Sequence, residues 1–110
     1  MKIPSELIVL KVIAKHRPIK GKINLHNLFR ELQEKGILKT EFNFVKYSFG
    51  YYSKDLEEVL SSLKNLGLIR ILNGSDGFEV YEITDRGIAV LESLHQIQSR
   101  GLQLSESMSR

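Results

Sequence analysis

The side chains that most often perform chemistry in proteins are few in this chain, and their spacing does not suit catalysis. The 110 residues contain no cysteine, which removes disulfides, thiolate metal ligands and thiol nucleophiles. The three histidines, His16, His26 and His95, fall on three different predicted helices and lack the spacing of a metal-binding pair. We expect His26 to lie on the surface beside Asn27. Ser53 has no histidine or carboxylate at a sequence spacing that would indicate an activated nucleophile. The sequence therefore predicts no catalytic residue, no metal and no cofactor, and favours a binding protein over an enzyme.

Cationic side chains offer a different chemistry, the binding of phosphates. Residues 1–50 carry ten Lys or Arg and four Asp or Glu, a balance of +6, whereas residues 51–110 carry six and nine, a balance of −3. Residues 11–22 contain five cations and no acid, a cluster that can mark a phosphate site. The alternative is an ordinary solvated helix end and loop. The glycine turns at residues 21–22 and 74–77 lack the full spacing of a nucleotide-binding phosphate loop.

Hydrophobic periodicity and capping residues predict the elements that position these side chains. The first half of the chain is expected to contain a helix over residues 4–16, an extended stretch over 19–23, a helix that Asn24 caps and Gly36 ends, a strand within 38–48 and a turn over 49–52. The second half is expected to contain a helix that Ser53 caps and Gly67 ends, strands over 68–72 and 78–83 joined by a turn over 73–77, and a last helix that Thr84 caps. We expect one domain over residues 1–100 and a polar tail over residues 101–110.

Two passages link this order of elements to a known superfamily. Residues 56–69 read LEEVLSSLKNLGLI, which resembles the passage from the third helix into the wing of winged helix-turn-helix proteins, and residues 81–87 read YEITDRG, which is similar to the "Y.LT..G" ending of that wing. The resemblance covers residues 5–98. It implies an α+β, mainly α fold: a winged helix-turn-helix with three helices, a β-hairpin wing and an additional C-terminal helix. Residues 44–53 also resemble the "Y..GPYS" element of antitoxin-associated winged-helix proteins, with Tyr51 in place of the proline.

The resemblance implies sequence-dependent binding to double-stranded DNA by a small transcriptional regulator. The third helix would enter the major groove, the hairpin would reach the adjacent minor groove or backbone, and the second helix would direct its N-terminus at a phosphate. An inward stripe of Leu56, Val59, Leu60, Leu63 and Leu66 would leave the short polar side chains of Ser61, Ser62 and Asn65 to contact base edges. The residues expected to contact the DNA backbone are Lys20, Lys22, Tyr52, Lys54, Lys64 and Arg70.

Acidic residues on the same predicted face argue against DNA. The outward side of the third helix would carry Asp55, Glu57 and Glu58 against two lysines, a local charge of −1. The hairpin turn over residues 73–77 contains an aspartate and no cation. The alternative function is a winged-helix module that binds another protein, for which the aromatic group of Phe49, Tyr51 and Tyr52 would form a contact patch.

The last predicted helix has more apolar length than a small core needs. Ile88, Leu91, Leu94 and Ile97 are therefore expected to form a homodimer contact, the alternative being that this helix only packs back on the first helix. A dimer would double the DNA contacts and read two half-sites. The sequence shows no signal peptide and no stretch of about 20 apolar residues, which together with the lack of cysteine predicts a cytoplasmic location.

Overall fold

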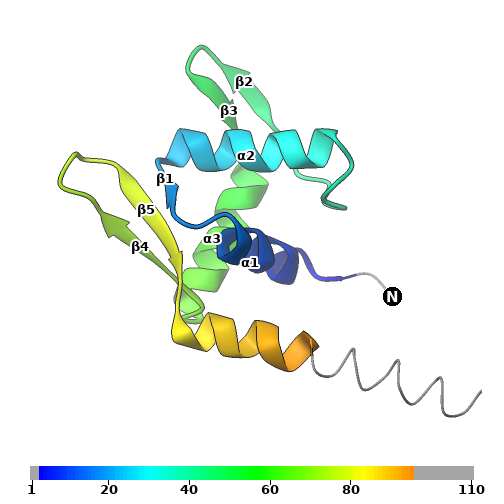
Figure 1. The fold of residues 1–110 in the computed structure, drawn as a ribbon. Helices are drawn as coiled ribbons and strands as arrows, with labels where there is room; N and C mark the ends of the chain where they lie inside the picture. The colour runs from blue at the N-terminus through cyan, green and yellow to red at the C-terminus, as the bar shows by residue number, and fades with distance from the viewer. Residues whose placement is uncertain (1–2, 96–110) are drawn as a thin grey trace, which may run out of the picture.

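The computed structural model describes residues 3–95 as helices packed against short antiparallel strands, an α+β fold (Figure 1). None of the described helices is long and apolar enough to cross a membrane. The helices are α1 (Ser5–Lys15), α2 (Lys22–Glu34), α3 (Lys54–Asn65) and a last helix over residues 85–95. The strands are β1 (Ile19–Lys20), β2 (Val45–Tyr47), β3 (Gly50–Tyr52), β4 (Ile69–Asn73) and β5 (Glu79–Ile83).

The strands form two separate antiparallel sheets. The first has the order β1-β5-β4, in which β5 pairs with β1 through Ile19 and Tyr81 and with β4 through Ile69 and Ile83. The second is a hairpin of β2 and β3, which lies between α2 and α3 in the chain. In Figure 1 the β2–β3 hairpin extends above α2 and the β4–β5 hairpin extends to the left of the helices, whereas the helix over residues 85–95 lies below them.

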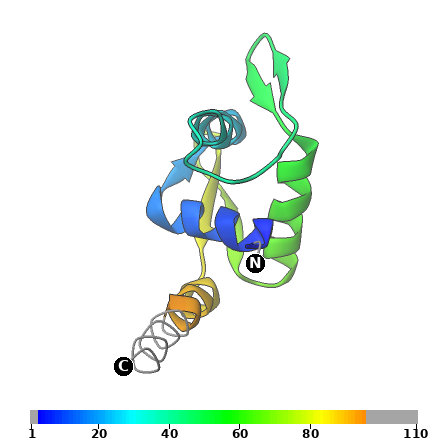
Figure 2. The same ribbon diagram turned by 90° about the vertical axis from the view of Figure 1, so that its right-hand side faces the viewer.

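One hydrophobic core joins α1, α2, α3 and the three-stranded sheet. In Figure 2, α1 lies below the end-on view of α2 and runs toward α3, which stands at the right and packs on α1. The fully buried side chains include Ile13 of α1, Phe29 of α2, Leu60 of α3 and Tyr81 of β5. Burial of residues of this size stabilises a fold by about 1.5–3 kcal/mol each, so packing rather than helix propensity holds the helices together.

Several predicted helix ends are confirmed. The side chain of Ser53 accepts a hydrogen bond from the Leu56 N–H at 3.2 Å and caps α3, and the Thr84 hydroxyl accepts the Gly87 N–H at 3.1 Å and caps the last helix. The chain turns out of α3 at Gly67 with φ +74, a conformation that glycine adopts without strain. These helix ends depend on the capping residue itself and its neighbours in the chain, so they can be predicted from the sequence.

The start of α2 differs from the prediction. Helix α2 begins at Lys22, two residues earlier than the expected cap Asn24, and Gly21 precedes it without a capping side chain. The Asn24 side chain instead donates a hydrogen bond to the Lys20 carbonyl at 2.9 Å. The extended stretch is correspondingly short and ends at Lys20, because only Ile19 and Lys20 pair with β5.

The segment between α2 and α3 also differs from the prediction. The expected strand within residues 38–48 is confined to β2, and the expected turn over residues 49–52 is largely strand β3. The preceding loop is fixed by Gln33, whose amide donates to the Phe42 carbonyl at 2.9 Å and accepts from the Phe42 N–H at 3.0 Å. Phe42 is thereby held in the core instead of in a strand.

Candidate nucleic-acid interface

The outward surface of α3 is formed by one row of polar side chains. Lys54, Glu58, Ser61 and Asn65 follow one another at spacings of four, three and four residues, so they share one face of the helix, and all four are exposed. The opposite face buries Leu56, Leu60 and Leu63. Leu66, expected to continue the inward stripe, is 54% exposed because α3 ends at Asn65. In the described part of the chain, no hydrogen bond or ion pair engages the side chains of the row.

The two flanks of this row differ in charge. Glu57 and Lys64 lie on the flank next to the start of α2, where Glu57 meets Lys22. The other flank borders a shallow hollow between α3 and the start of α1, lined by Ser62 together with the acids Glu6, Asp55 and Glu58. The predicted base-contacting residues are therefore divided, with Ser61 and Asn65 in the outer row and Ser62 on the acidic flank.

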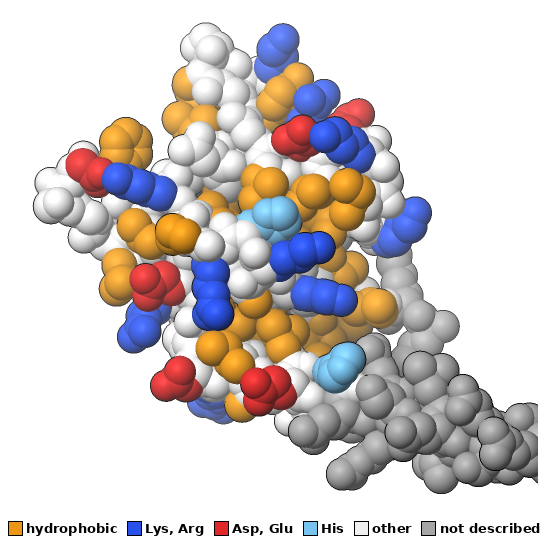
Figure 3. All heavy atoms as spheres, in the orientation of Figure 1, with side chains coloured by type: hydrophobic (Ala, Val, Ile, Leu, Met, Phe, Trp, Pro, Cys, Tyr) orange, Lys and Arg blue, Asp and Glu red, His pale blue; other side chains and the backbone are white. Residues whose placement is uncertain are grey.

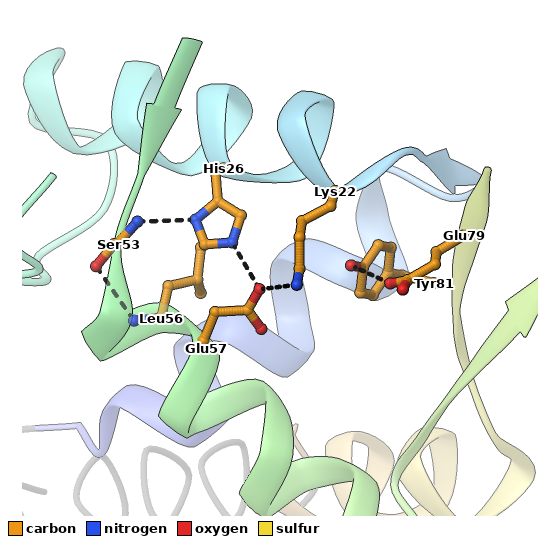
Figure 4. Close-up of polar contacts among 7 residues, drawn as sticks. All are labelled: Lys22, His26, Ser53, Leu56, Glu57, Glu79 and Tyr81. Carbon is orange, nitrogen blue, oxygen red and sulfur yellow. Dashed lines mark hydrogen bonds and ion pairs between the residues drawn. The ribbon is translucent and has the colours of Figure 1, made fainter. Parts of the chain in front are cut away.

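A buried polar network connects α2 to the first turn of α3 (Figure 4). The Ser53 N–H donates to Nδ1 of His26 at 3.0 Å, and Nε2 of His26 lies 3.2 Å from Oε1 of Glu57. Lys22 Nζ lies 3.0 Å from the same carboxylate oxygen. Because a backbone N–H can only donate, Nδ1 must accept, so the proton of the neutral ring resides on Nε2 and is directed at Glu57. Burial lowers the pKa of His26 more than the hydrogen bond to Glu57 raises it, so the ring is neutral at pH 7.

This network corrects two expectations. His26 is not a surface histidine but is fully buried, and Ser53 has both a histidine and a carboxylate nearby. The group nevertheless does not have the geometry of a nucleophilic triad, because the Ser53 hydroxyl faces the Leu56 N–H rather than His26. Ser53 is also fully buried. The sequence does indicate one pair of the network, since Lys22 and His26 are four residues apart and share one face of α2.

The acids of α3 are mostly turned away from its outer row. Glu57 is directed at α2, and Asp55 accepts a hydrogen bond from the Asn43 N–H at 2.9 Å. Of the charges expected on the outward surface, only Glu58 remains beside Lys54 and Lys64. The fully exposed charged side chains of α3 are thus two lysines and one acid, whereas Asp55 and Glu57 are half-buried and keep their charges beside this surface.

Three predicted phosphate-binding cations are engaged in ion pairs. Lys20 pairs with Asp76 in the turn of the β4–β5 hairpin, and this contact, with the Phe78 N–H, lowers the pKa of the Asp76 carboxyl. Lys22 pairs with Glu57, and that hydrogen bond raises the pKa of the Lys22 ammonium. Arg70 Nε lies 3.3 Å from Glu82 on the neighbouring strand. Exposed pairs of this kind contribute little stability, about 0–1 kcal/mol, so their cations can exchange a carboxylate for a phosphate at small cost.

The remaining cations of the basic cluster do not join this surface. Helix α1 packs on α3, so its exposed residues Lys11 and Lys15 point away from α3. Figure 3 shows the face that carries α1 and α2, on which Lys and Arg side chains are spread among apolar ones and are not concentrated in a single patch. Only Lys20 and Lys22 lie where α2 begins.

Tyr52 lies at the base of the β2–β3 hairpin and contacts protein groups. Its ring stacks on His26, with centroids 4.7 Å apart and planes 21° apart. The residue is half-buried. The ring therefore packs at the junction between α2 and α3, and only part of Tyr52 is exposed for the phosphate contact expected of it.

The predicted dimer residues lie along the last helix. Ile88 and Leu91 are half-buried and pack against the hydrophobic core, and Leu94 is also half-buried. Ile97 lies outside the described residues. The helix is far from both hairpin tips (Figure 1), so contacts made through it would leave the outer row of α3 and the hairpins accessible.

None of the family models, curated proteins or solved structures compared with this chain matches it. The candidate interface is therefore argued from its own geometry. Among residues 3–95, no group of three or more His, Asp or Glu side chains could hold a metal ion.

Proposed function

We propose that this protein is a winged helix-turn-helix protein that binds double-stranded DNA as a homodimer and regulates transcription in the cytoplasm. Helix α3 enters the major groove, and the β4–β5 hairpin contacts the adjacent minor groove or backbone. The connection over residues 35–53 is longer than the turn of about 3–4 residues in a helix-turn-helix, and its additional length forms the β2–β3 hairpin.

The observation that carries this proposal is the exposed polar row on α3. Polar side chains without partners in the protein have their hydrogen-bonding capacity available for a ligand. Ser61 and Asn65 can donate and accept, which suits base edges, and the flanking lysines Lys54 and Lys64 can bind phosphates. Ser62 is a weaker candidate, because the neighbouring acids repel a phosphate backbone.

The start of α2 supports the same orientation. Its first turn has no acidic residue and no capping side chain, and the cations Lys20 and Lys22 flank it. A helix N-terminus of this kind favours an anion. In this proposal a DNA phosphate lies beside the start of α2 while α3 occupies the groove.

Charge reversal at two matched lysines tests the assignment. Lys64 and Lys39 are both exposed, and Lys39 lies in the loop that follows α2. We expect Lys64→Glu to weaken duplex binding about tenfold, because a phosphate contact is replaced by repulsion, and Lys39→Glu to change it little. Fluorescence anisotropy with a labelled duplex measures both affinities. Equal losses in the two variants would contradict the placement of α3 in the groove.

A further inference from the structure

We propose that the β2–β3 hairpin is a second nucleic-acid contact, in which Phe49 stacks on a nucleobase while Lys46 binds the neighbouring phosphate. This inference rests on the proposed DNA-binding function and adds an element that the resemblance to winged-helix proteins does not assign. In Figures 1 and 2 the hairpin projects beyond α2 and is accessible at its tip.

A continuous series of aromatic rings leads from the buried α2–α3 junction to this tip. The ring of Tyr52 stacks on buried His26 and meets Tyr47 edge-on, with centroids 6.4 Å apart and planes 75° apart. Tyr47 in turn stacks on Phe49, with centroids 5.2 Å apart and planes only 4° apart. The series ends in solvent, since Tyr47 is 45% and Phe49 is 58% exposed. A parallel ring pair that is open to solvent at one end has the geometry to accept another flat ring.

The two faces of the hairpin have different roles. Cross-strand pairing places Val45 opposite Tyr52 and Tyr47 opposite Gly50, so these residues form the aromatic face. Lys46 pairs with Tyr51 on the other face, where the Arg30 guanidinium lies 4.0 Å from the centre of the Tyr51 ring. One face thus presents the rings of Tyr47 and Tyr52, and the other combines the Tyr51 ring with the cations Lys46 and Arg30.

The hairpin is held firmly before any ligand arrives. Asn27 accepts a hydrogen bond from the Tyr51 N–H at 2.9 Å. A Cβ atom at Gly50 would come within 2.9 Å of Ile23 and 3.0 Å of Asn27, so glycine is required for this close approach to α2. An aromatic side chain on a fixed element loses little conformational entropy on binding.

The charge of the segment favours nucleic acid over a protein partner. The hairpin itself, residues 45–52, contains Lys46 and no acid, and Arg30 of α2 lies over its Tyr51 ring. Exposed aromatic rings combined with cations are typical of surfaces that stack bases while contacting the phosphate backbone. Apolar wedges of this kind also enter base steps of duplex DNA and partly unstack them. The ligand is therefore a nucleobase, either at an opened step of a duplex or in a single strand.

The absence of tryptophan from the chain provides a direct probe. Phe49→Trp makes the tip of the hairpin the only source of tryptophan emission. We expect this emission to be quenched when the protein is saturated either with a duplex or with one of its separated strands. Quenching by the duplex indicates a base at an opened duplex step, and quenching by the separated strand indicates a base of single-stranded DNA. Phe49→Ala should weaken binding about tenfold. Ile37→Ala, which truncates a 62% exposed side chain in the loop that follows α2, should leave binding unchanged.

The outcomes separate this inference from the proposed function. Binding of labelled DNA with unchanged tryptophan emission in both arms, and equal affinity for Phe49→Ala and wild type, would overturn the hairpin contact and leave α3 as the interface. Absence of DNA binding by the folded wild-type protein would overturn both proposals. Circular dichroism of the three variants verifies folding, which these exposed positions should not disturb.

Discussion

At the scale of single residues, His26 shows how a buried polar group can fix the relation between two helices. Its two ring nitrogens connect α2 to the Ser53 backbone and to Glu57, and its face supports Tyr52. The local sequence pattern does not indicate that this histidine is buried, because Asn27 beside it suggests a polar helix face. Burial depends on the β2–β3 hairpin that covers this turn of α2, and pairing between distant segments is not encoded in local periodicity.

The protonation of His26 predicts a pH-dependent stability. Burial lowers its pKa in the folded protein below the ordinary value of 6.5, so the unfolded chain binds the proton more readily. The contribution of His26 is present in full above pH 6.5 and is lost as the pH falls from there through the lowered pKa. Urea unfolding of wild type at pH 7.5 and 5.5 should show this loss, since protonation of Nδ1 breaks the bond to Ser53.

Two histidine variants separate this effect from other titrations. In His26→Gln the pH dependence over this interval should shrink, and overall stability should fall by about 1–3 kcal/mol because the Ser53 N–H loses its partner. In His16→Gln, which alters an exposed histidine, the loss should persist. A wild-type stability that does not change between the two pH values would contradict the neutral, buried His26.

At the scale of elements, the sequence predicted those parts of the fold that local chemistry determines. The caps at Ser53 and Thr84 and the helix end at Gly67 were confirmed, and β4 and β5 lie close to the predicted strands. The β2–β3 hairpin was missed because its turn, Ser48-Phe49, lacks the Asn-Gly or Gly-Gly pair that signals a tight hairpin. The polar row on α3 was predicted as a helix face, but the partners of Asp55 and Glu57 depend on tertiary structure.

The cap of α3 gives a prediction at this scale. Ser53→Ala removes the acceptor for the Leu56 N–H at a fully buried position and should destabilise the protein by about 1 kcal/mol. For a domain of this size that lowers Tm by about 4–8 °C in a thermal melt. Ser61→Ala makes the same chemical change on the exposed row of α3 and should shift Tm little. Similar shifts in both variants would contradict the capping role of Ser53.

At the scale of the whole molecule, the position of the last helix predicts how two copies assemble. A dimer formed through this helix would place two α3 surfaces on the side away from the contact, as two half-sites require. Light scattering should therefore give a mass about twice the 12.6 kDa of the chain. Leu94→Glu should yield monomers, whereas Ser93→Glu, at an exposed neighbour on the same helix, should remain dimeric. A monomeric wild type at micromolar concentration would contradict this arrangement.

The central claim, that the outer surface of α3 binds DNA through its backbone phosphates, is tested most directly by the salt dependence of duplex binding. The measurement is a fluorescence-anisotropy titration of the wild-type protein against a random-sequence duplex at several salt concentrations. Two phosphate contacts per protomer, from Lys54 and Lys64, predict for the dimer a slope of log K against log salt of about −3.6 or steeper. Failure of a folded sample to bind at low salt would contradict the claim and favour a protein partner for the same surface.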